Sequence, residues 1–353
     1  MNPQDEAAPR DGTSLMRTHR SAVLVSGGAG YIGSHTAKAL KAAGFTPVVL
    51  DNFSTGNRFA LQFGESHEGS MEDTGFVGDI IRKHSIEAVV LFSACAYVGE
   101  STRNPRKYYS NNLTNSIRFL DAVLDSGVRN LIFSSSCAIY GIPPEVPITE
   151  SSPPNPLSPY GETKYFMERI LRWYGESHGL RSLCLRYFNA AGADESGEIG
   201  EHHDPETHLI PLAIYAGLGK GPLSVMGNDY PTLDGTAIRD YIHVTDLADA
   251  HVRAVQYLLD GGRPVNMNLG AGRGTSILEV LRMVEQVSGA PVPHWFVPRR
   301  LGDAPELVAD AGLAQATLGW KAVNSDLAKI VQTAWKWHRK PIGVGSKASH
   351  AVV

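Results

Sequence analysis

The sequence predicts an α/β protein in which a doubly wound parallel sheet precedes a smaller C-terminal lobe. Short apolar segments alternate with helical segments through the first half of the chain, a pattern typical of a parallel sheet with helices on both faces. After about Asn189, glycine, proline and aspartate become frequent and polar loops lengthen. Because 353 residues exceed the usual span of one hydrophobic core, we expect two lobes.

The elements of the first lobe are expected to begin at Ser21. Residues 1–20 contain too few large apolar groups to offset the entropy lost on ordering, so we predict a disordered extension there. Buried strands are predicted at residues 22–25, 47–50, 88–92 and 130–134. Helices are predicted at residues 34–43, which end before Gly44, and at residues 111–125.

The second half contains fewer regular elements. Two helices are predicted, at residues 244–259 and 276–288, and polar loops are predicted at 222–237 and 296–305. We expect this lobe to lie over the carboxyl edge of the sheet, where α/β proteins gather their ligands.

The composition excludes several classes of protein. The 32 basic and 36 acidic residues give a net charge of −4, without the basic excess of a nucleic-acid-binding protein. No apolar run is long enough to cross a bilayer, and residues 1–20 lack the apolar core of a signal peptide. Cys95, Cys137 and Cys184 are odd in number and widely spaced, so they cannot form a disulfide framework. We therefore expect a cytoplasmic protein that binds neither nucleic acid nor membrane.

A glycine-rich loop predicts a dinucleotide site. Gly27, Gly30 and Gly33 follow the first strand and open a helix, so the backbone can approach a pyrophosphate that faces the helix N-terminus. Asp51 ends the second strand eighteen residues after Gly33, the place of a carboxylate that binds the adenosine ribose. Asn52 follows it, and no arginine stands beside it to bind a 2′-phosphate. NAD is therefore favoured over NADP.

A catalytic group is predicted around Tyr160 and Lys164. Their spacing places both side chains on one helix face, where the lysine ammonium favours the phenolate. A tyrosine tuned in this way accepts a proton from a sugar hydroxyl near neutral pH. Ser136 ends a predicted strand at the carboxyl edge of the sheet, where its hydroxyl can bind the reacting oxygen.

These residues together resemble the extended short-chain dehydrogenase/reductase family and, within it, the bacterial UDP-glucose 4-epimerases. The resemblance extends from about Ser21 to Pro341. Its motifs are Gly27–His35, Val98–Ser101, Leu185–Gly192, Gly227–Thr232, Arg239–Val244 and Pro298–Arg300.

The resemblance implies an isomerase that keeps its NAD. Tyr160 would take the proton of the sugar 4-hydroxyl while C4 gives a hydride to NAD, and the 4-ketose would turn and recover the hydride on its opposite face. UDP-glucose and UDP-galactose would thus interconvert, in galactose and nucleotide-sugar metabolism. The Rossmann-type NAD-binding domain would span residues 21–190, the nucleotide-sugar-binding lobe 191–345 with some chain crossing between lobes, and a tail 346–353. A homodimer through helices of the first lobe, including the one that carries Tyr160, is also implied.

The resemblance assigns further site residues. Those of the cofactor site are Gly27, Gly30, Tyr31, Ile32, Gly33, Asp51, Asn52, Phe92, Asn111, Ser134, Tyr160, Lys164 and Tyr187. Those of the substrate site are Ser136, Tyr160, Phe188, Asn189, His208, Leu209, Arg239, Arg300, Asp303 and Leu307. The two arginines would bind a diphosphate through charge-assisted hydrogen bonds.

Four positions depart from the family pattern. Ala96 stands where several members carry a lysine, and Ser70 replaces an aspartate near the adenine, so NAD retention is open. His208 replaces an asparagine near the diphosphate. Leu307 replaces a tyrosine that restricts 2-acetamido sugars in some members, so UDP-N-acetylglucosamine is an alternative substrate.

Sister enzymes of the same fold dehydrate or decarboxylate nucleotide sugars. Cys137 and Ala138 follow Ser136. Dehydratases need an acid/base pair at these two positions, and decarboxylases commonly carry a glutamate at the second of them. The sequence therefore argues against dehydratase and decarboxylase activity. UDP-xylose/UDP-arabinose epimerases share the sequence motif Ala96–Ser101, so this activity remains an alternative. An inactive NAD-binding scaffold is a further alternative.

No metal site is predicted. The segment His202–His208 is rich in histidine and acid, but adjacent histidines point apart in an extended chain and Pro205 breaks any helix.

Overall fold

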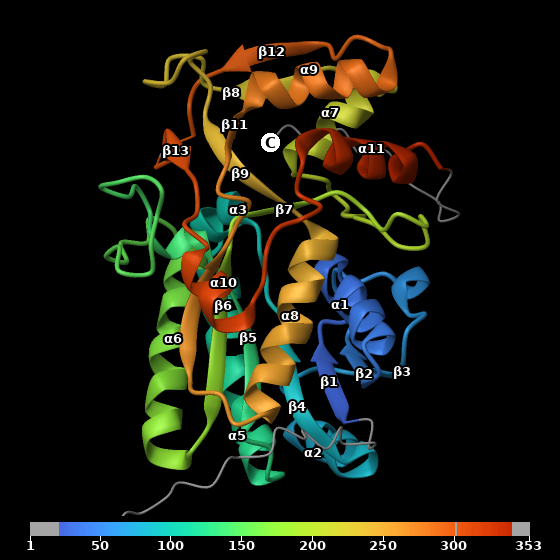
Figure 1. Ribbon diagram of the computed structural model, residues 1–353, viewed down its shortest axis with the longest axis vertical. Coiled ribbons are helices and arrows are strands. Elements are labelled where there is room, and N and C mark those ends of the chain that lie inside the picture. Colours follow the sequence, from blue (N-terminus) through green and yellow to red (C-terminus); the bar gives the residue numbers. More distant parts are fainter. Residues whose placement is uncertain (1–20, 301, 341–353) are drawn as a thin grey trace, which may run out of the picture.

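The computed structural model describes residues 21–300 and 302–340, which form two lobes (Figure 1). The extension predicted at 1–20 and the tail predicted at 346–353 lie outside the described residues. No helix of the described part is long and apolar enough to cross a membrane.

The first lobe is built on a seven-stranded parallel sheet with the order β10-β6-β5-β4-β1-β2-β3. This is the doubly wound topology expected from the sequence. Its strands are β1 (Ala22–Ser26), β2 (Thr46–Asp51), β3 (Glu65–Glu68), β4 (Ile86–Leu91), β5 (Asn130–Ser136), β6 (Arg181–Tyr187) and β10 (Val265–Leu269). The four predicted strands are all present. The polar edge strand β3 was not predicted, because its sequence has no apolar residue.

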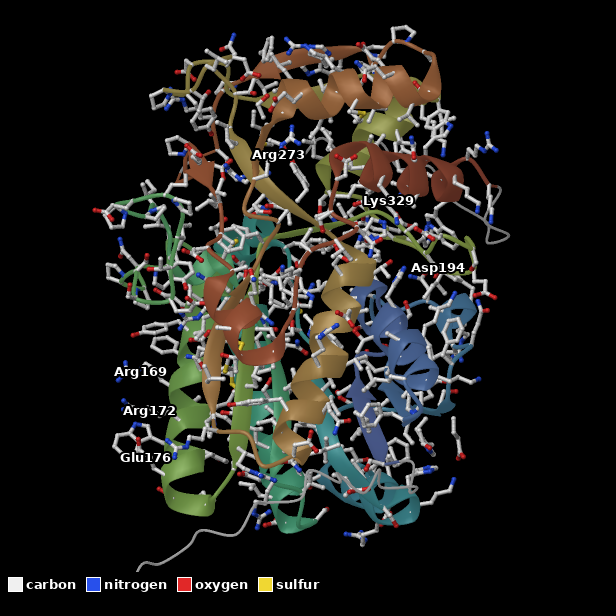
Figure 2. The ribbon with its side chains drawn as sticks, in the orientation of Figure 1. Arg169, Arg172, Glu176, Asp194, Arg273 and Lys329 are labelled. Atoms are coloured by element: carbon white, nitrogen blue, oxygen red, sulfur yellow. The ribbon has the colours of Figure 1, made fainter. Side chains whose placement is uncertain are left out.

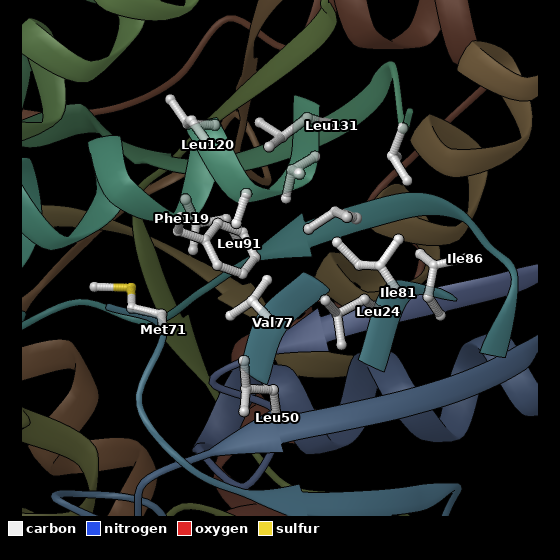
Figure 3. Close-up of a cluster of buried hydrophobic side chains, with 14 of the residues drawn as sticks. Leu24, Leu50, Met71, Val77, Ile81, Ile86, Leu91, Phe119, Leu120 and Leu131 are labelled. Carbon is white, nitrogen blue, oxygen red and sulfur yellow. The ribbon is translucent and has the colours of Figure 1, made fainter. Parts of the chain in front are cut away.

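Helices cover both faces of this sheet (Figure 1). On one face lie α1 (Tyr31–Ala42), α8 (Val244–Leu259) and α10 (Gly312–Leu318); on the other lie α2 (Thr74–His84), α5 (Ser116–Asp125) and α6 (Pro159–His178). Figure 3 shows the second layer, where Leu24, Leu91 and Leu131 of the sheet meet Val77 and Phe119 of the helices. The short α3 (Val98–Arg103) and α4 (Pro105–Tyr109) and a π-helical turn (Ser110–Asn115) precede α5.

The second lobe is centred on β9 and lies above the carboxyl ends of the parallel strands in Figure 1. Its strands are β7 (Asn189–Ala191), β8 (Leu223–Met226), β9 (Ile238–His243), β11 (Gly274–Ser276), β12 (His294–Val297) and β13 (Glu306–Leu307). Its helices are α7 (Leu209–Gly217), α9 (Ile277–Ser288) and α11 (Leu327–His338).

The second half is more regular than the sequence predicted. Helices α8 and α9 are confirmed, but β8 lies entirely inside the polar loop predicted at 222–237, and β12 overlaps the start of the loop predicted at 296–305. Each of these strands has only four residues and is paired to the other across about seventy residues of chain, so neither carries a local signal. Helix α7 was missed because it is apolar on all sides and contains Pro211, which a first helical turn tolerates.

The two lobes are linked by strands and by polar contacts. Strand β10 and helix α8 return from the second half of the chain to the first lobe. The Tyr31 hydroxyl donates to the carbonyl of Gly192 at 2.6 Å, and Lys38 forms an ion pair with Asp194 at 2.9 Å. Asp194 is labelled in Figure 2, at the boundary between α1 and the second lobe.

Candidate active site

The glycine-rich loop lies between β1 and α1 and leaves an open helix N-terminus. Gly27 has φ +80°, and a Cβ at Gly33 would lie 2.2 Å from the Gly27 carbonyl oxygen, so both positions require glycine. Gly30 is the N-cap residue of the twelve-residue α1 and provides no side-chain cap. The first N–H groups of α1, from Tyr31 and Ile32, are therefore suited to an anionic diphosphate.

Asp51 ends β2 beside this loop. One of its carboxylate oxygens accepts a hydrogen bond from the Ala29 N–H at 2.9 Å, and the other accepts from the Phe53 N–H at 2.8 Å. Burial raises the pKa of Asp51, and these backbone donors oppose that shift. The carboxylate thus also braces the glycine-rich loop, a role that the sequence spacing did not reveal. Asn52, the next residue, is exposed.

Tyr160, Lys164 and Ser136 come together at the carboxyl edge of the sheet. Ser136 is the last residue of β5, and Tyr160 and Lys164 lie in the first two turns of α6. All three side chains are buried, and the Lys164 ammonium lies 5.7 Å from the centre of the Tyr160 ring.

The close approach of α6 to the end of β5 depends on two small residues. Ser158 caps the helix by accepting from the Gly161 N–H at 3.2 Å. A Cβ at Gly161 would lie 2.5 Å from the Ala138 carbonyl oxygen, in the turn that follows Ser136. Glycine therefore allows the first turn of α6 to rest on this turn and brings Tyr160 beside Ser136.

Burial dominates the electrostatics of the pair. It raises the pKa of Tyr160 to about 12, although the Ser136 hydroxyl opposes the shift. It lowers the pKa of Lys164 to about 7, although Cys95 and Glu168 oppose the shift. The Lys164 ammonium donates to the Ser134 carbonyl oxygen at 2.6 Å, which fixes its position. A bound cation near Tyr160 would favour its phenolate form.

The lowered pKa of Lys164 predicts a pH-dependent stability for the cofactor-free protein. Between pH 7 and 10.5 the unfolded lysine binds a proton that the folded one does not, so unfolding becomes less favourable as pH rises. The stability of the wild type relative to a Lys164→Met variant should increase by up to about 1.4 kcal/mol per pH unit in this window. Urea unfolding of both proteins at pH 7 and 9 measures it. A difference that is constant with pH would contradict the lowered pKa.

The predicted walls of the cofactor cleft are also assembled. The Tyr187 hydroxyl forms a short hydrogen bond with the Ser134 hydroxyl. The ring of Phe92 lies 4.7 Å from the imidazole of His251, and that of Tyr187 lies 6.1 Å from it. His251, on α8, was not predicted as part of this group because its helix is far away in sequence.

Asn112 is a supporting residue that sequence reasoning missed in favour of its neighbour Asn111. Its buried amide accepts from the Cys95 N–H at 2.8 Å, and it donates to the Cys95 carbonyl at 2.9 Å and to the Thr163 hydroxyl at 3.2 Å. It therefore joins the loop after β4 to α6. Asn111 donates to the Asn112 side chain at 3.0 Å. The only sequence signal was an Asn-Asn pair inside a predicted helix.

Several of the predicted substrate residues lie near one another. Arg239 on β9 forms an ion pair with Asp303 at 3.1 Å, and Leu307 of β13 pairs with Arg239 in the register of the sheet. Phe188 packs in the apolar cluster that includes Leu307. Arg300 is exposed and contacts the Met226 sulfur at 3.3 Å.

His208 and Leu209 begin α7, and Asn189 begins β7. The Nδ1 atom of His208 lies 2.6 Å from Oε1 of Glu201, so this nitrogen of the imidazole is already engaged. Among the departures, Ala96 is exposed and the Ser70 hydroxyl accepts from the Glu72 N–H at 3.5 Å.

Comparison with known proteins agrees with this geometry. The model of the NAD dependent epimerase/dehydratase family matches residues 23–270. A UDP-glucose 4-epimerase of Rhizobium leguminosarum bv. trifolii is 49% identical over 319 residues, which cover 90% of this chain and 97% of the relative.

Two solved structures show the same fold. UDP-glucose 4-epimerase from Brucella ovis, in complex with NAD, superposes with a TM-score of 0.88 at 50% identity and covers 90% of this chain and 98% of its own. The Bifidobacterium longum enzyme, in complex with NAD+ and UDP, superposes with a TM-score of 0.85 at 36% identity and covers 90% and 98%. The chain therefore belongs to the NAD dependent epimerase/dehydratase family.

Proposed function

We propose that this chain is an isomerase that interconverts UDP-glucose and UDP-galactose by inverting carbon 4 of the sugar. The observation that carries the proposal is the buried group of Tyr160, Lys164 and Ser136 at the carboxyl edge of the sheet, beside an open helix N-terminus. The names of the relatives support the same activity.

The chain's own residues would move a proton and position the sugar. Tyr160 accepts the proton of the 4-hydroxyl and later returns it, and Ser136 holds the same oxygen by a hydrogen bond. Lys164 binds the nicotinamide ribose, and its ammonium together with the cationic nicotinamide would oppose the rise in the Tyr160 pKa that burial causes. NAD, when bound, takes up a hydride and gives it back. Cys137 and Ala138 provide no acid or base for elimination, so the 4-ketose is returned to the hydroxyl level.

The glycine-rich loop would hold the cofactor. Gly27, Gly30 and Gly33 permit close approach, the N–H groups of Tyr31 and Ile32 face the diphosphate, and Asp51 accepts from the ribose hydroxyls. The aromatic and serine side chains at the strand ends and the two asparagines would support it: Asn52, Phe92, Asn111, Ser134 and Tyr187. We propose that residues 21–190 bind the cofactor and residues 191–345 the nucleotide sugar, with α8, β10 and α10 crossing back to the first lobe.

Arg239 and Arg300 would bind the UDP diphosphate. Arg239 is largely buried and already oriented by Asp303, so it offers preorganised donors to phosphate oxygens. Phe188, Asn189 and Leu209 lie on segments that lead from the sheet into the second lobe, where they would contact the rest of the nucleotide sugar.

Conversion of UDP-galactose to UDP-glucose by the purified chain tests the proposal, first without added NAD and then with excess NAD. We expect turnover without addition, which would mean that NAD copurifies despite Ala96 and Ser70. Activity only on UDP-xylose or UDP-N-acetylglucosamine would move the chain to a sister epimerase. No activity on any of the three would refute the epimerase proposal.

UDP-N-acetylglucosamine is a second candidate substrate because Leu307 is smaller than tyrosine. Leu307 is half-buried beside Phe188, and a tyrosine there would narrow the sugar site. We expect the wild type to epimerise UDP-N-acetylglucosamine. A Leu307→Tyr variant should lose roughly 10–200-fold in kcat/KM for this sugar and keep its rate with UDP-galactose. Equal losses for both sugars would contradict a selective role.

We also propose a homodimer formed through α6. Phe166 and Trp173 lie seven residues apart on one side of this helix and are 40% and 54% exposed. Arg169, Arg172 and Glu176 point away from the sheet on the outer side of α6, as Figure 2 shows. A Trp173→Glu variant is expected to shift the protein from dimer to monomer in sedimentation velocity. Trp295→Glu, at a Trp 51% exposed on β12, is the matched control and should remain dimeric.

A reducing compartment, the cytoplasm, is proposed on the basis of the cysteines. Cys95, Cys137 and Cys184 are all free thiols in the structure.

A further inference from the structure

The segment that joins the two halves of the second lobe gathers two histidines and two glutamates. Residues 201–208 lead toward α7 without regular secondary structure and bend at Asp204 and Pro205. The bend brings Glu201 and His203, which precede it, close to Glu206 and His208, which follow it. The ligand atoms of the four side chains lie within 4.8 Å of one another.

The distances between these atoms approach those of a tetrahedral metal site. Nδ1 of His203 lies 3.3 Å from Oε1 of Glu201 and 3.7 Å from Oε1 of Glu206. Nδ1 of His208 lies 2.6 Å and 3.4 Å from the same two oxygens. Bonds of about 2.1 Å from Zn²⁺ to nitrogen and oxygen place tetrahedral ligands roughly 3.4 Å apart. Three of the four distances are close to this value, and only the shortest one would have to widen.

The cluster leaves buried polar atoms without hydrogen bonds. Among the described residues, Oε1 of Glu201, Nδ1 of His203 and Oε2 of Glu206 have no aligned partner. The side chains of Glu201 and Glu206 are only 3% and 5% exposed, so both carboxylates are shielded from bulk solvent. Buried polar atoms without partners are rare and costly in native proteins. Oε1 of Glu201 and Nδ1 of His203 both belong to the cluster, whereas the cluster oxygen of Glu206 is Oε1, which already accepts two backbone hydrogen bonds.

The two buried carboxylates of the cluster need two positive charges to compensate them. The side chains of Glu201 and Glu206 are almost fully buried, and the imidazoles of His203 and His208 lie within 3.7 Å of their oxygens. Two protons on the imidazoles meet the requirement, and so does one divalent cation that displaces them.

We propose that Glu201, His203, Glu206 and His208 bind one divalent cation of the zinc type. Two imidazole nitrogens and two carboxylate oxygens are donors that Zn²⁺ accepts, and four protein ligands close the site, as in structural zinc centres. This replaces the expectation from sequence that the segment holds no metal. That expectation compared the adjacent His202 and His203, whereas the cluster excludes His202 and takes Glu201, which precedes the histidine-rich run.

The neighbours of the cluster indicate what the cation would do. The Trp337 indole of α11 donates to the Glu201 carbonyl at 2.8 Å, and Asn57 of the first lobe donates to the His202 carbonyl at 3.0 Å. The N–H groups of Thr207 and His208 donate to Oε1 of Glu206 at 2.8 and 2.9 Å. A cation bound here would fasten the start of α7 to both lobes. A cation bound to Nδ1 of His208 would also leave Nε2 as the protonated nitrogen of this imidazole.

Metal analysis of the full chain, prepared without a histidine tag, tests the proposal. A second cluster, Glu65, His67 and His84, is removed from the count by working in a His67→Gln background. After stripping with chelator and dialysis against Zn²⁺, we expect one zinc per chain by mass spectrometry and a rise in Tm. A His203→Gln variant should weaken zinc affinity by more than the roughly 10–100-fold that loss of an outer-sphere partner costs.

His202→Gln is the matched control, because this neighbouring histidine lies in the same segment but outside the cluster, and it should retain zinc. Circular dichroism and NAD content verify that each variant is folded. X-ray absorption of the zinc-loaded protein should show about two imidazole and two oxygen ligands. A stripped wild type that takes up no zinc and shows no change in Tm would overturn the proposal and leave an imidazolium–carboxylate cluster. Equal zinc binding by wild type and His203→Gln would overturn it as well.

Discussion

Replacing Tyr160 with phenylalanine is expected to reduce turnover of UDP-galactose by about 10²–10⁴-fold, the contribution of a positioned general base. The variant removes the hydroxyl that we propose as acceptor of the 4-hydroxyl proton and leaves the ring in its buried place. NAD binding should be retained, because the glycine-rich loop and Asp51 are untouched. The measurement combines the conversion of UDP-galactose to UDP-glucose with the NAD content of the denatured protein.

Tyr165→Phe is the matched control for this variant. Tyr165 lies on the same helix and is half-buried, but it packs in the apolar cluster around Ile139 and Tyr140. Its loss of a hydroxyl should leave turnover nearly unchanged. A Tyr160→Phe protein that turns over as fast as an active wild type would show that another group accepts the proton. If neither protein turned over UDP-galactose, the result would instead favour the inactive NAD-binding scaffold.

Replacing Arg186 with methionine is expected to destabilise the protein by about 3–5 kcal/mol, the usual cost of leaving one partner of a buried ion pair uncompensated. Arg186 on β6 donates to Glu168 on α6 through two hydrogen bonds of 2.9 and 2.6 Å, and the two side chains are 7% and 3% exposed. Without the guanidinium, the buried carboxylate keeps only Ser135 and Asn266 as donors. The pair holds α6, and with it Tyr160, against the sheet.

Urea unfolding measures this loss, with Arg172→Met as the control. Arg172 is an exposed arginine of the same helix that pairs with Glu176 at 3.7 Å, and its removal should cost at most about 1 kcal/mol. A double variant, Glu168→Leu with Arg186→Met, should recover much of the stability because no charge remains buried. Equal effects of Arg186→Met and Arg172→Met would refute the importance of the buried pair.

The cofactor lobe could be predicted from sequence because its signals are local. An apolar strand, a glycine-rich loop and a helix are adjacent in the chain around Gly27–Gly33, and Asp51 follows at a spacing fixed by one helix and one strand. Tyr160 and Lys164 are likewise close together on one helix. Each of these patterns is read within about thirty residues, and the structure places them where the doubly wound topology requires.

The rest depended on contacts between distant segments. The pairing of β8 with β12 joins residues 223–226 to residues 294–297. Neither segment contains a turn motif or a hydrophobic periodicity that predicts this pairing. The contact of Asn112 with Thr163 and that of His251 with Phe92 join elements that are about fifty or more residues apart. The convergence of Glu201, His203, Glu206 and His208 was not predicted for a different reason: the bend at Asp204 and Pro205, not the order of the residues, decides which side chains converge.

Epimerisation of UDP-galactose labelled with deuterium at C4 tests the central claim most directly, namely that the hydrogen removed from this carbon is returned to it inside one closed site. With wild-type protein and no added NAD, we expect UDP-glucose that retains the deuterium at C4, because Tyr160 exchanges only the hydroxyl proton. Loss of the label to water, or no conversion even with excess NAD, would contradict the account.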